Sequence, residues 1–308
     1  MALIAGPTAS GKSDLAIDLA LEIERRGGLA LVINADSAQV YADLQVLSAR
    51  PAEGEMRGIQ HRLFGAWDGA EACSAADWAH AAKREIENAH MAGMVPILVG
   101  GTGLYIRTLL DGIAPVPPID TQVREAVRAM ETPQAWEALR NEDPDYAAAL
   151  NPADRARVSR GLEVVRSTGT PLREWQQRKV GGIGDAIDLH PLILLPDREA
   201  LYARCDARFA HMVEAGAREE VERLLARDLS PAVPVMRAIG VREIAGWVEG
   251  RWTRDSAIER GARATRNYAK RQFTWFRHQP PAGWPRTDPE GCNIQEQFET
   301  LLLTFGLT

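Results

Sequence analysis

The stretch Gly6-Pro7-Thr8-Ala9-Ser10-Gly11-Lys12-Ser13 fits the pattern G-x-x-x-x-G-K-[ST] of a phosphate-binding loop, or P-loop. An apolar run at 2–5 precedes it, and residues 14–26 follow with helical periodicity. The glycines let backbone N–H groups turn toward phosphate oxygens, Lys12 adds a positive charge, and Ser13 is a ligand for Mg²⁺. This strand–loop–helix order predicts a diphosphate or triphosphate site at residues 6–13 rather than a structural turn.

Three further apolar runs, at 29–33, 94–99 and 189–195, indicate buried strands. Helical patterns separate them, which is typical of a parallel sheet covered on both faces. We therefore expect an α/β fold with a P-loop NTPase-like parallel sheet. Ligands in such folds bind beyond the carboxyl ends of the strands.

The pattern divides the chain into a core, an insertion and a tail. Residues 1–115 and 185–278 are predicted to form the P-loop core with its C-terminal helices. Residues 116–184 follow a proline-rich break, are rich in Arg and Glu, and carry no strand signal, which predicts an α-helical insertion domain. Residues 279–308 are expected to form a loosely attached C-terminal tail.

The composition is that of an ordinary globular protein, with 45% apolar residues and a net charge of −6 over 308 residues, and it excludes a disordered or fibrous chain. No apolar run reaches the roughly 18–20 residues that span a bilayer, so we expect no membrane association. The first residues lack a basic leader, so a secretory signal is not expected. Three widely spaced cysteines favour a reducing cytoplasm.

Residues 251–278 form a basic segment, with eight Lys or Arg against two Asp or Glu. The local charge is +6, so the rest of the chain carries −12. This asymmetry favours one face that binds a polyanion, with a merely solvated helix face as the alternative. On a helix, one stripe is basic and another is apolar. The basic stripe holds Arg263, Arg266, Lys270 and Arg277, and the apolar stripe, expected to face the core, holds Ala262, Ala269, Phe273 and Phe276.

Two further motifs follow predicted strands. Asp36 ends the second strand, where it could hold Mg²⁺, act as a general base, or cap the following turn. Gly100-Gly101-Thr102-Gly103 ends the third strand, where it either brings backbone close to a ligand or makes a tight turn.

Taken together, the motifs resemble those of the tRNA dimethylallyltransferase (isopentenyltransferase) family over nearly the whole chain up to Arg277. The matching segments, in this order, are residues 6–13, Asp-Ser-Ala-Gln-Val-Tyr at 36–41, His-Arg-Leu at 61–63, Leu-Val-Gly-Gly-Thr-Gly-Leu-Tyr at 98–105, Arg-Val-Ser-Arg-Gly-Leu-Glu-Val at 157–164, Ala-Ile-Gly-Val-Arg-Glu at 238–243 and Tyr-Ala-Lys-Arg-Gln-Phe-Thr-Trp-Phe-Arg at 268–277.

The resemblance implies that the P-loop holds the pyrophosphate of dimethylallyl diphosphate. The allyl group then passes to N6 of the adenine next to the anticodon of tRNA, and pyrophosphate leaves. It implies catalytic roles for Asp36 as general base, Thr102 and Lys12, and Mg²⁺ held at Ser13. It also implies a cytoplasmic enzyme, which we expect to be a monomer. The residues implied to bind the tRNA anticodon stem-loop are Asp36, Ser37, Ala38, Gln39, Thr102, Arg124, Arg157, Arg160, Arg237 and Arg242.

The sequence departs from the family pattern at three places. Leu47-Ser48-Ala49-Arg50-Pro51 stands where Gly-Thr-Ala-Lys-Pro is usual, so the loop loses a glycine. Ala156 replaces a Gln, and Val241 replaces an aromatic residue. None of these changes removes a chemical role.

Three alternatives compete with this interpretation. A small-molecule kinase or NTPase explains the P-loop and Asp36, but not the basic stripe or the insertion. An enzyme that prenylates free adenosine phosphate does not explain the matches at 157–164 and 238–277. A nucleotide-switched RNA-binding protein would carry out no chemistry.

Overall fold

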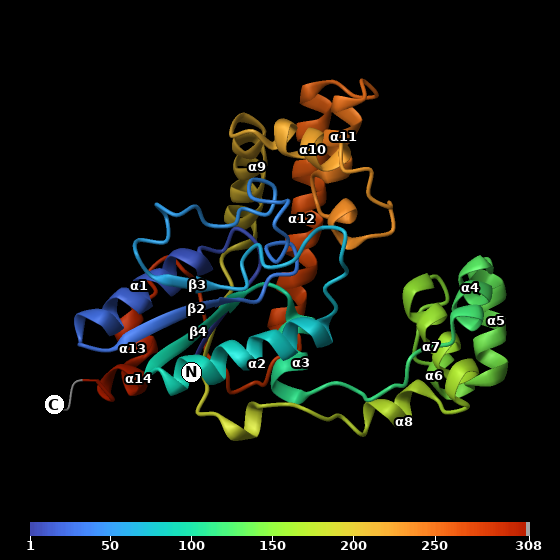
Figure 1. Cartoon of the computed structure of the whole chain (residues 1–308), viewed down its shortest axis with the longest axis horizontal. Helices are drawn as coiled ribbons and strands as arrows, with labels where there is room; N and C mark the ends of the chain where they lie inside the picture. Colours follow the sequence, from blue (N-terminus) through green and yellow to red (C-terminus); the bar gives the residue numbers. More distant parts are fainter. Residues whose placement is uncertain (306–308) are drawn as a thin grey trace. The chain divides into compact units, whose positions relative to one another are not determined.

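The computed structural model describes residues 1–305. The chain folds into two compact units, Met1–Leu109 with the chain from Gly184 onward, and Leu110–Ile183 (Figure 1). Within residues 1–305, no helix combines the length and the apolar character needed to cross a bilayer.

The larger unit is built on a six-stranded sheet of order β3-β2-β4-β1-β5-β6 in which every pairing is parallel, so the predicted α/β fold is confirmed. The strands are β1 (Ala2–Ala5), β2 (Leu29–Asn34), β3 (Gln60–Arg62), β4 (Met94–Gly100), β5 (His190–Leu194) and β6 (Arg286–Thr287). β1, β2 and β4 end side by side, because Ala5 pairs with Gly100 and Asn34 with Val99. Their following loops therefore meet at one edge of the sheet.

Side chains alternate between the two faces of the sheet. One face, with Ala2 and Ile4, packs against α1 (Lys12–Arg25). The other face is covered by α2 (Ala75–Met91), whose buried Trp78 donates a hydrogen bond to the Asn34 carbonyl oxygen, and α3 (Gly103–Asp111) follows β4. Both strands missed by the sequence, β3 and β6, are two or three residues long and lie at the sheet edges.

The C-terminal segment differs from the loosely attached tail expected from the sequence. Through residue 305 it packs on the core, since Phe298, Leu301 and Leu302 are buried against the face covered by α1. β6 extends the sheet, and two short helices follow, α13 (Ile294–Gln297) and α14 (Glu299–Leu303). Residues 306–308 of the expected tail lie outside the described residues.

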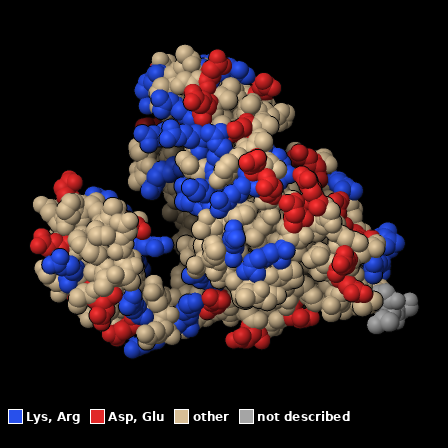
Figure 2. All heavy atoms as spheres, turned by 180° about the vertical axis from the view of Figure 1, so that it is seen from behind, with Lys and Arg blue, Asp and Glu red and all other residues tan. Residues whose placement is uncertain are grey.

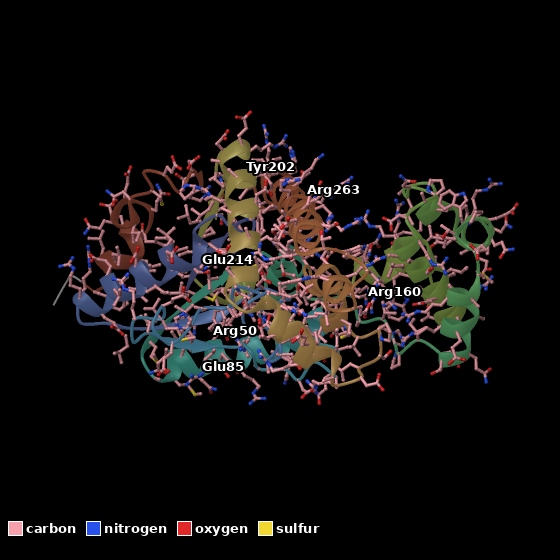
Figure 3. The ribbon with its side chains drawn as sticks, turned by 90° about the horizontal axis from the view of Figure 1, so that it is seen from above. Arg50, Glu85, Arg160, Tyr202, Glu214 and Arg263 are labelled. Atoms are coloured by element: carbon pink, nitrogen blue, oxygen red, sulfur yellow. The ribbon has the colours of Figure 1, made fainter. Side chains whose placement is uncertain are left out.

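Four helices and a 3-10 turn form a second layer of this unit: α9 (Arg198–Glu214), α10 (Ala217–Leu225), η2 (Pro234–Arg237), α11 (Val241–Val248) and α12 (Arg254–His278). α9 packs along α12 (Tyr202 and Arg263 are labelled on them in Figure 3). At their crossing, a Cβ on Gly261 would lie 1.9 Å from the Phe209 ring, so the helices approach closely. The predicted apolar stripe of α12 is buried, and Arg263, Lys270 and Arg277 of the basic stripe are exposed. Arg266, predicted to belong to the same stripe, is half-buried because it pairs with Asp206 of α9.

The smaller unit is helical: α4 (Thr121–Ala129), α5 (Thr132–Glu142), α6 (Pro144–Ala147), α7 (Arg155–Thr168) and α8 (Leu172–Gln176). A small core of Val127, Leu139, Val158 and Leu162 holds α4 to α7 together. Its two ends run side by side, where Ile113 and Val180 form an antiparallel bridge.

Candidate active site

The P-loop adopts the geometry of an anion cradle. Ala9 (φ 60°) and Gly11 (φ 80°) are left-handed, which turns the loop back on itself before α1 begins. Gly6 lies so close to β5 that a Cβ there would approach the Leu194 carbonyl oxygen to 2.7 Å. No side chain of the described residues caps α1, so its first N–H groups remain available to an anion.

Two cations face this loop. Lys12 is 8% exposed and its ammonium donates to the Pro7 carbonyl oxygen over 3.2 Å. Burial lowers the pKa of Lys12 to about 8, against the opposing influence of Asp36. Arg208, reaching in from α9, donates to Thr8 Oγ1 over 3.3 Å, and burial lowers its pKa also. Neither cation has a carboxylate within 4 Å among residues 1–305, so the pair favours binding an anion.

A cavity of about 610 Å³ lies over the P-loop. Besides residues 8–13, it is lined on one side by α9 and on the other by the loop after β2. The polar groups on its wall include Lys12, Ser13, Asp36, Gln39, Ser48 and Arg208. Gln39 is buried, and its amide donates to the Ser48 and Ala49 carbonyl oxygens. It therefore stabilises the loop after β2, which forms this wall of the cavity.

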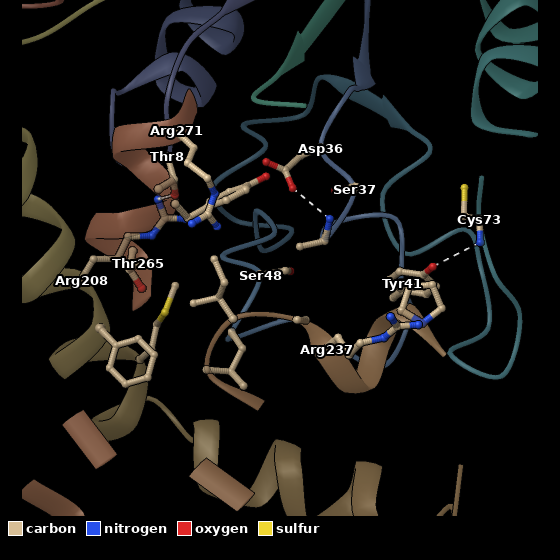
Figure 4. Close-up of a pocket in the computed structure, with 18 of the residues that line it drawn as sticks. Thr8, Asp36, Ser37, Tyr41, Ser48, Cys73, Arg208, Arg237, Thr265 and Arg271 are labelled. Carbon is tan, nitrogen blue, oxygen red and sulfur yellow. Dashed lines mark hydrogen bonds between the residues drawn. The ribbon is translucent and has the colours of Figure 1, made fainter. Parts of the chain in front are cut away.

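Asp36 lies two residues beyond the end of β2, whereas the sequence pattern places the strand end at Asp36 itself. The Asn34 side chain fixes the backbone of Asp36. Its Oδ1 accepts from the Asp36 N–H (2.9 Å), and its Nδ2 donates to the Asp36 carbonyl oxygen (3.0 Å). One carboxylate oxygen accepts from the Ala38 N–H over 3.0 Å (Figure 4), which closes a turn and not a helix. The 7% exposed side chain lines two cavities at once.

The second cavity, of about 310 Å³, adjoins the first at Thr8, Asp36 and Arg208. Two hydroxyl groups on its wall, those of Ser37 and Tyr268, lie against Thr102, which follows β4. The Ser37 N–H donates to Thr102 Oγ1 over 2.9 Å, Thr102 Oγ1 donates to Ser37 Oγ over 3.2 Å, and the Tyr268 hydroxyl bonds to both. Burial raises the pKa of Tyr268. The opposite wall carries apolar groups such as Leu47 and Phe209.

The other predicted residues are placed as follows. Ala38 and Arg237 line the second cavity, where Figure 4 shows Arg237 coming from η2. Arg242, on α11, is exposed and lines a separate hollow with Arg237. Arg124, Arg157 and Arg160 belong to the smaller unit, where Arg157 and Arg160 are exposed and Arg124 is half-buried.

The departure at residues 47–51 is accommodated without a glycine. Leu47 keeps an ordinary negative φ, and the left-handed residue of this loop is Ala49 (φ 47°). The loop is held by Glu220 of α10, whose buried carboxylate accepts from three consecutive N–H groups, those of Gln45, Val46 and Leu47.

Sequence reasoning missed three residues at this site: Arg208, Tyr268 and Gln272. Each comes from a helix far along the chain, and its placement depends on tertiary packing. Tyr268 and Gln272 lie on the face of α12 that carries Ala269 and Phe273, four residues apart, which is the signal that could have drawn attention to them.

A parallel sheet with a P-loop, unpaired cations over it, and a carboxylate on the wall of an adjoining cavity defines an enzyme that transfers a group from a phosphorylated donor. The model of the IPP transferase family matches residues 39–279, and the chain belongs to that family.

Its relatives carry consistent names. The chain is 65% identical to a tRNA dimethylallyltransferase of Erythrobacter litoralis, covering 98% of this chain and 95% of the relative, and 65% identical to another of Novosphingobium aromaticivorans, covering 90% and 99%. A tRNA isopentenylpyrophosphate transferase structure from Bacillus halodurans superposes with a TM-score of 0.68 at 30% identity, covering 98% and 94%. A eukaryotic dimethylallyltransferase acting on tRNA gives 0.75 at 30% identity, covering 89% and 69%.

Proposed function

We propose that this enzyme transfers the dimethylallyl group of dimethylallyl diphosphate to N6 of the adenine next to the anticodon in tRNA and releases pyrophosphate. The observation that carries the proposal is the pair of adjoining cavities, one facing unpaired cations and the other facing hydroxyl groups, with Asp36 on the wall of both. The first suits the diphosphate, and the second suits the allyl chain and the incoming adenine.

In the diphosphate cavity, residues 6–13 bind the phosphate oxygens through backbone N–H groups, while Lys12 and Arg208 neutralise charge on the leaving pyrophosphate. Ser13, in the first turn of α1 and on the wall of this cavity, would hold a Mg²⁺ ion beside the diphosphate. Such an ion would further neutralise the diphosphate.

In the transfer step, adenine N6 forms a bond to C1 of the dimethylallyl group while the C1–O bond breaks, and pyrophosphate leaves with the electron pair. The N6 lone pair is delocalised into the ring, so removal of a proton assists the attack. Asp36 has a carboxylate oxygen free of the turn to accept that proton. Thr102, fixed by Ser37 and Tyr268, orients the amine.

The tRNA must present an unstacked adenine to the second cavity. We propose that residues 36–39, Arg237 and Arg242 contact it on the core, and that Arg124, Arg157 and Arg160 contact it from the insertion domain at 116–184. Figure 2 shows Lys and Arg side chains gathered in a band on the part of the core that carries α12, a surface suited to a phosphate backbone. We expect a monomer that acts in the cytoplasm, where tRNA is found.

The test is mass spectrometry of nucleosides from tRNA incubated with the protein and dimethylallyl diphosphate. We expect a dimethylallyl mass on the adenosine next to the anticodon and none when that base is changed to guanosine. Prenylation of free adenosine phosphate, or phosphoryl transfer from ATP without prenylation, would contradict the proposal.

A further inference from the structure

Gln272 of α12 joins two loops that follow different strands of the sheet. Its side chain is 5% exposed and uses both ends of its amide. Oε1 accepts from the Thr8 N–H over 2.8 Å, and Nε2 donates to the Gly101 carbonyl oxygen over 2.8 Å. One side chain therefore bonds to the P-loop and to the Gly100–Gly103 loop.

Both hydrogen bonds lie next to residues of the proposed reaction. Thr8 accepts the hydrogen bond of Arg208 at the diphosphate cavity, and Gly101 precedes Thr102, whose hydroxyl bonds to Ser37 on the wall of the second cavity. Gln272 itself lines neither cavity. Its influence on substrates must therefore pass through Thr8 and Gly101.

The space between the loops admits little else. The Gly6 N–H donates to the Gly100 carbonyl oxygen over 3.4 Å, and a Cβ on Gly101 would lie 2.3 Å from Gln272 Nε2. Glutamate would keep an acceptor for Thr8 and lose the donor for Gly101, and asparagine is one methylene shorter. The site is thus built for a donor and an acceptor at the end of a side chain of this length.

We propose that Gln272 is a positioning residue that fixes the diphosphate-binding loop against the loop carrying Thr102, and so sets the geometry between the leaving group and the attacking amine. The inference rests on the proposed function. It assigns to the inner face of α12 a role in alignment that is separate from the basic outer face.

The first experiment replaces Gln272 by Met, which keeps the length and removes both hydrogen bonds. We expect kcat for prenyl transfer to fall about 10- to 100-fold, since small misplacements of reacting groups have effects of this size, and the Kd for tRNA to stay unchanged. Thr274→Val on the same helix is the control, because within residues 1–305 that exposed hydroxyl bonds only to the Lys270 carbonyl oxygen. A folded Gln272→Met enzyme with wild-type kcat would overturn the proposal, even if its Tm is lower.

The second experiment is a double-mutant cycle with Gly101→Ala, whose added methyl group must displace Gln272. We expect Gly101→Ala to lower kcat in the wild-type background and to lower it by less with Gln272→Ala, which removes the 2.3 Å contact and leaves the Gly6 carbonyl oxygen at 3.0 Å. Losses that multiply would contradict the link.

If Gln272→Met does not fold, Gln272→Glu decides, because it keeps the shape and the acceptor for Thr8. We expect its kcat to be lowered and its thermal stability to stay closer to wild type, and wild-type kcat would overturn the inference. A wild-type protein without prenyl transfer would instead refute the proposed function.

Discussion

The core and the insertion use arginine in different ways. In the core, Arg208 extends over the P-loop and lines the cavity there. It has no carboxylate partner among residues 1–305. In the insertion, Arg166 forms three hydrogen bonds with Glu142, Arg128 pairs with Glu163, and Arg157 is 71% exposed beside Asp154. A partnerless cation at a cavity marks a site for a small anion held in one geometry, whereas an exposed cation such as Arg157 suits a long, hydrated polyanion.

The largest effect is expected in the core, from a substitution of Asp36. Asp36→Asn keeps the acceptor for the Ala38 N–H and loses the ability to take a proton, so kcat should fall about 10²- to 10⁴-fold with tRNA and diphosphate affinity retained. Single-turnover transfer measures it. Full activity would reduce Asp36 to a turn residue, and recovery in excess Mg²⁺ would make it a metal ligand.

The next effect concerns Lys12. Lys12→Ala removes a buried charge on the wall of the cavity proposed to hold the diphosphate, and kcat should fall about 10²- to 10³-fold. Lys179→Ala is the matched control, because that lysine is exposed and pairs with Asp111 within the smaller unit. Equal kinetics for the two variants would contradict the assignment.

A smaller effect is expected in the pH dependence of pyrophosphate binding to the core. Because burial lowers the pKa of Lys12 to about 8, the side chain loses its charge as the pH rises through 8. Pyrophosphate affinity should therefore weaken about tenfold between pH 7 and pH 9, and the dependence should be absent in Lys12→Ala. Burial of the charged lysine also destabilises the folded state below pH 8. This destabilisation is relieved as the pH rises from 8 toward 10.5, because the folded lysine has then lost its proton while the unfolded lysine still holds it. Calorimetric titration with pyrophosphate tests the binding.

The smallest effects belong to the insertion. Neutralising Arg157 and Arg160 should weaken tRNA binding and reduce the salt dependence of its Kd by about one unit of slope for each phosphate that is no longer bound. Pyrophosphate affinity should not change. Arg166 already forms an ion pair with Glu142. Arg166→Ala should therefore leave the salt dependence of the Kd closer to that of the wild type. An unchanged slope in the double variant would make Arg157 and Arg160 structural residues.

The parts of the site that sequence could predict are those encoded locally. Residues 6–13 bend as their glycine spacing requires, and the faces of α12 follow from a period of about 3.6 residues. β3 was missed because Gln60-His61-Arg62 is polar and short, and it joins the sheet only through β2. Arg208 and Gln272 carry no local motif. Their roles arise when α9 and α12 pack over loops that are distant in the sequence, 171 residues or more away.

The antiparallel bridge between Ile113 and Val180 has a consequence for how such a chain could have been assembled. It brings the entry and the exit of the insertion to one point, and the backbones there approach so closely that a Cβ on Gly112 would lie 2.4 Å from the Val180 carbonyl oxygen. The helices between these two residues therefore form an insertion with a hydrophobic core of its own. Loss or exchange of these helices would leave the strand order of the sheet intact, so the insertion and the core are free to evolve at different rates.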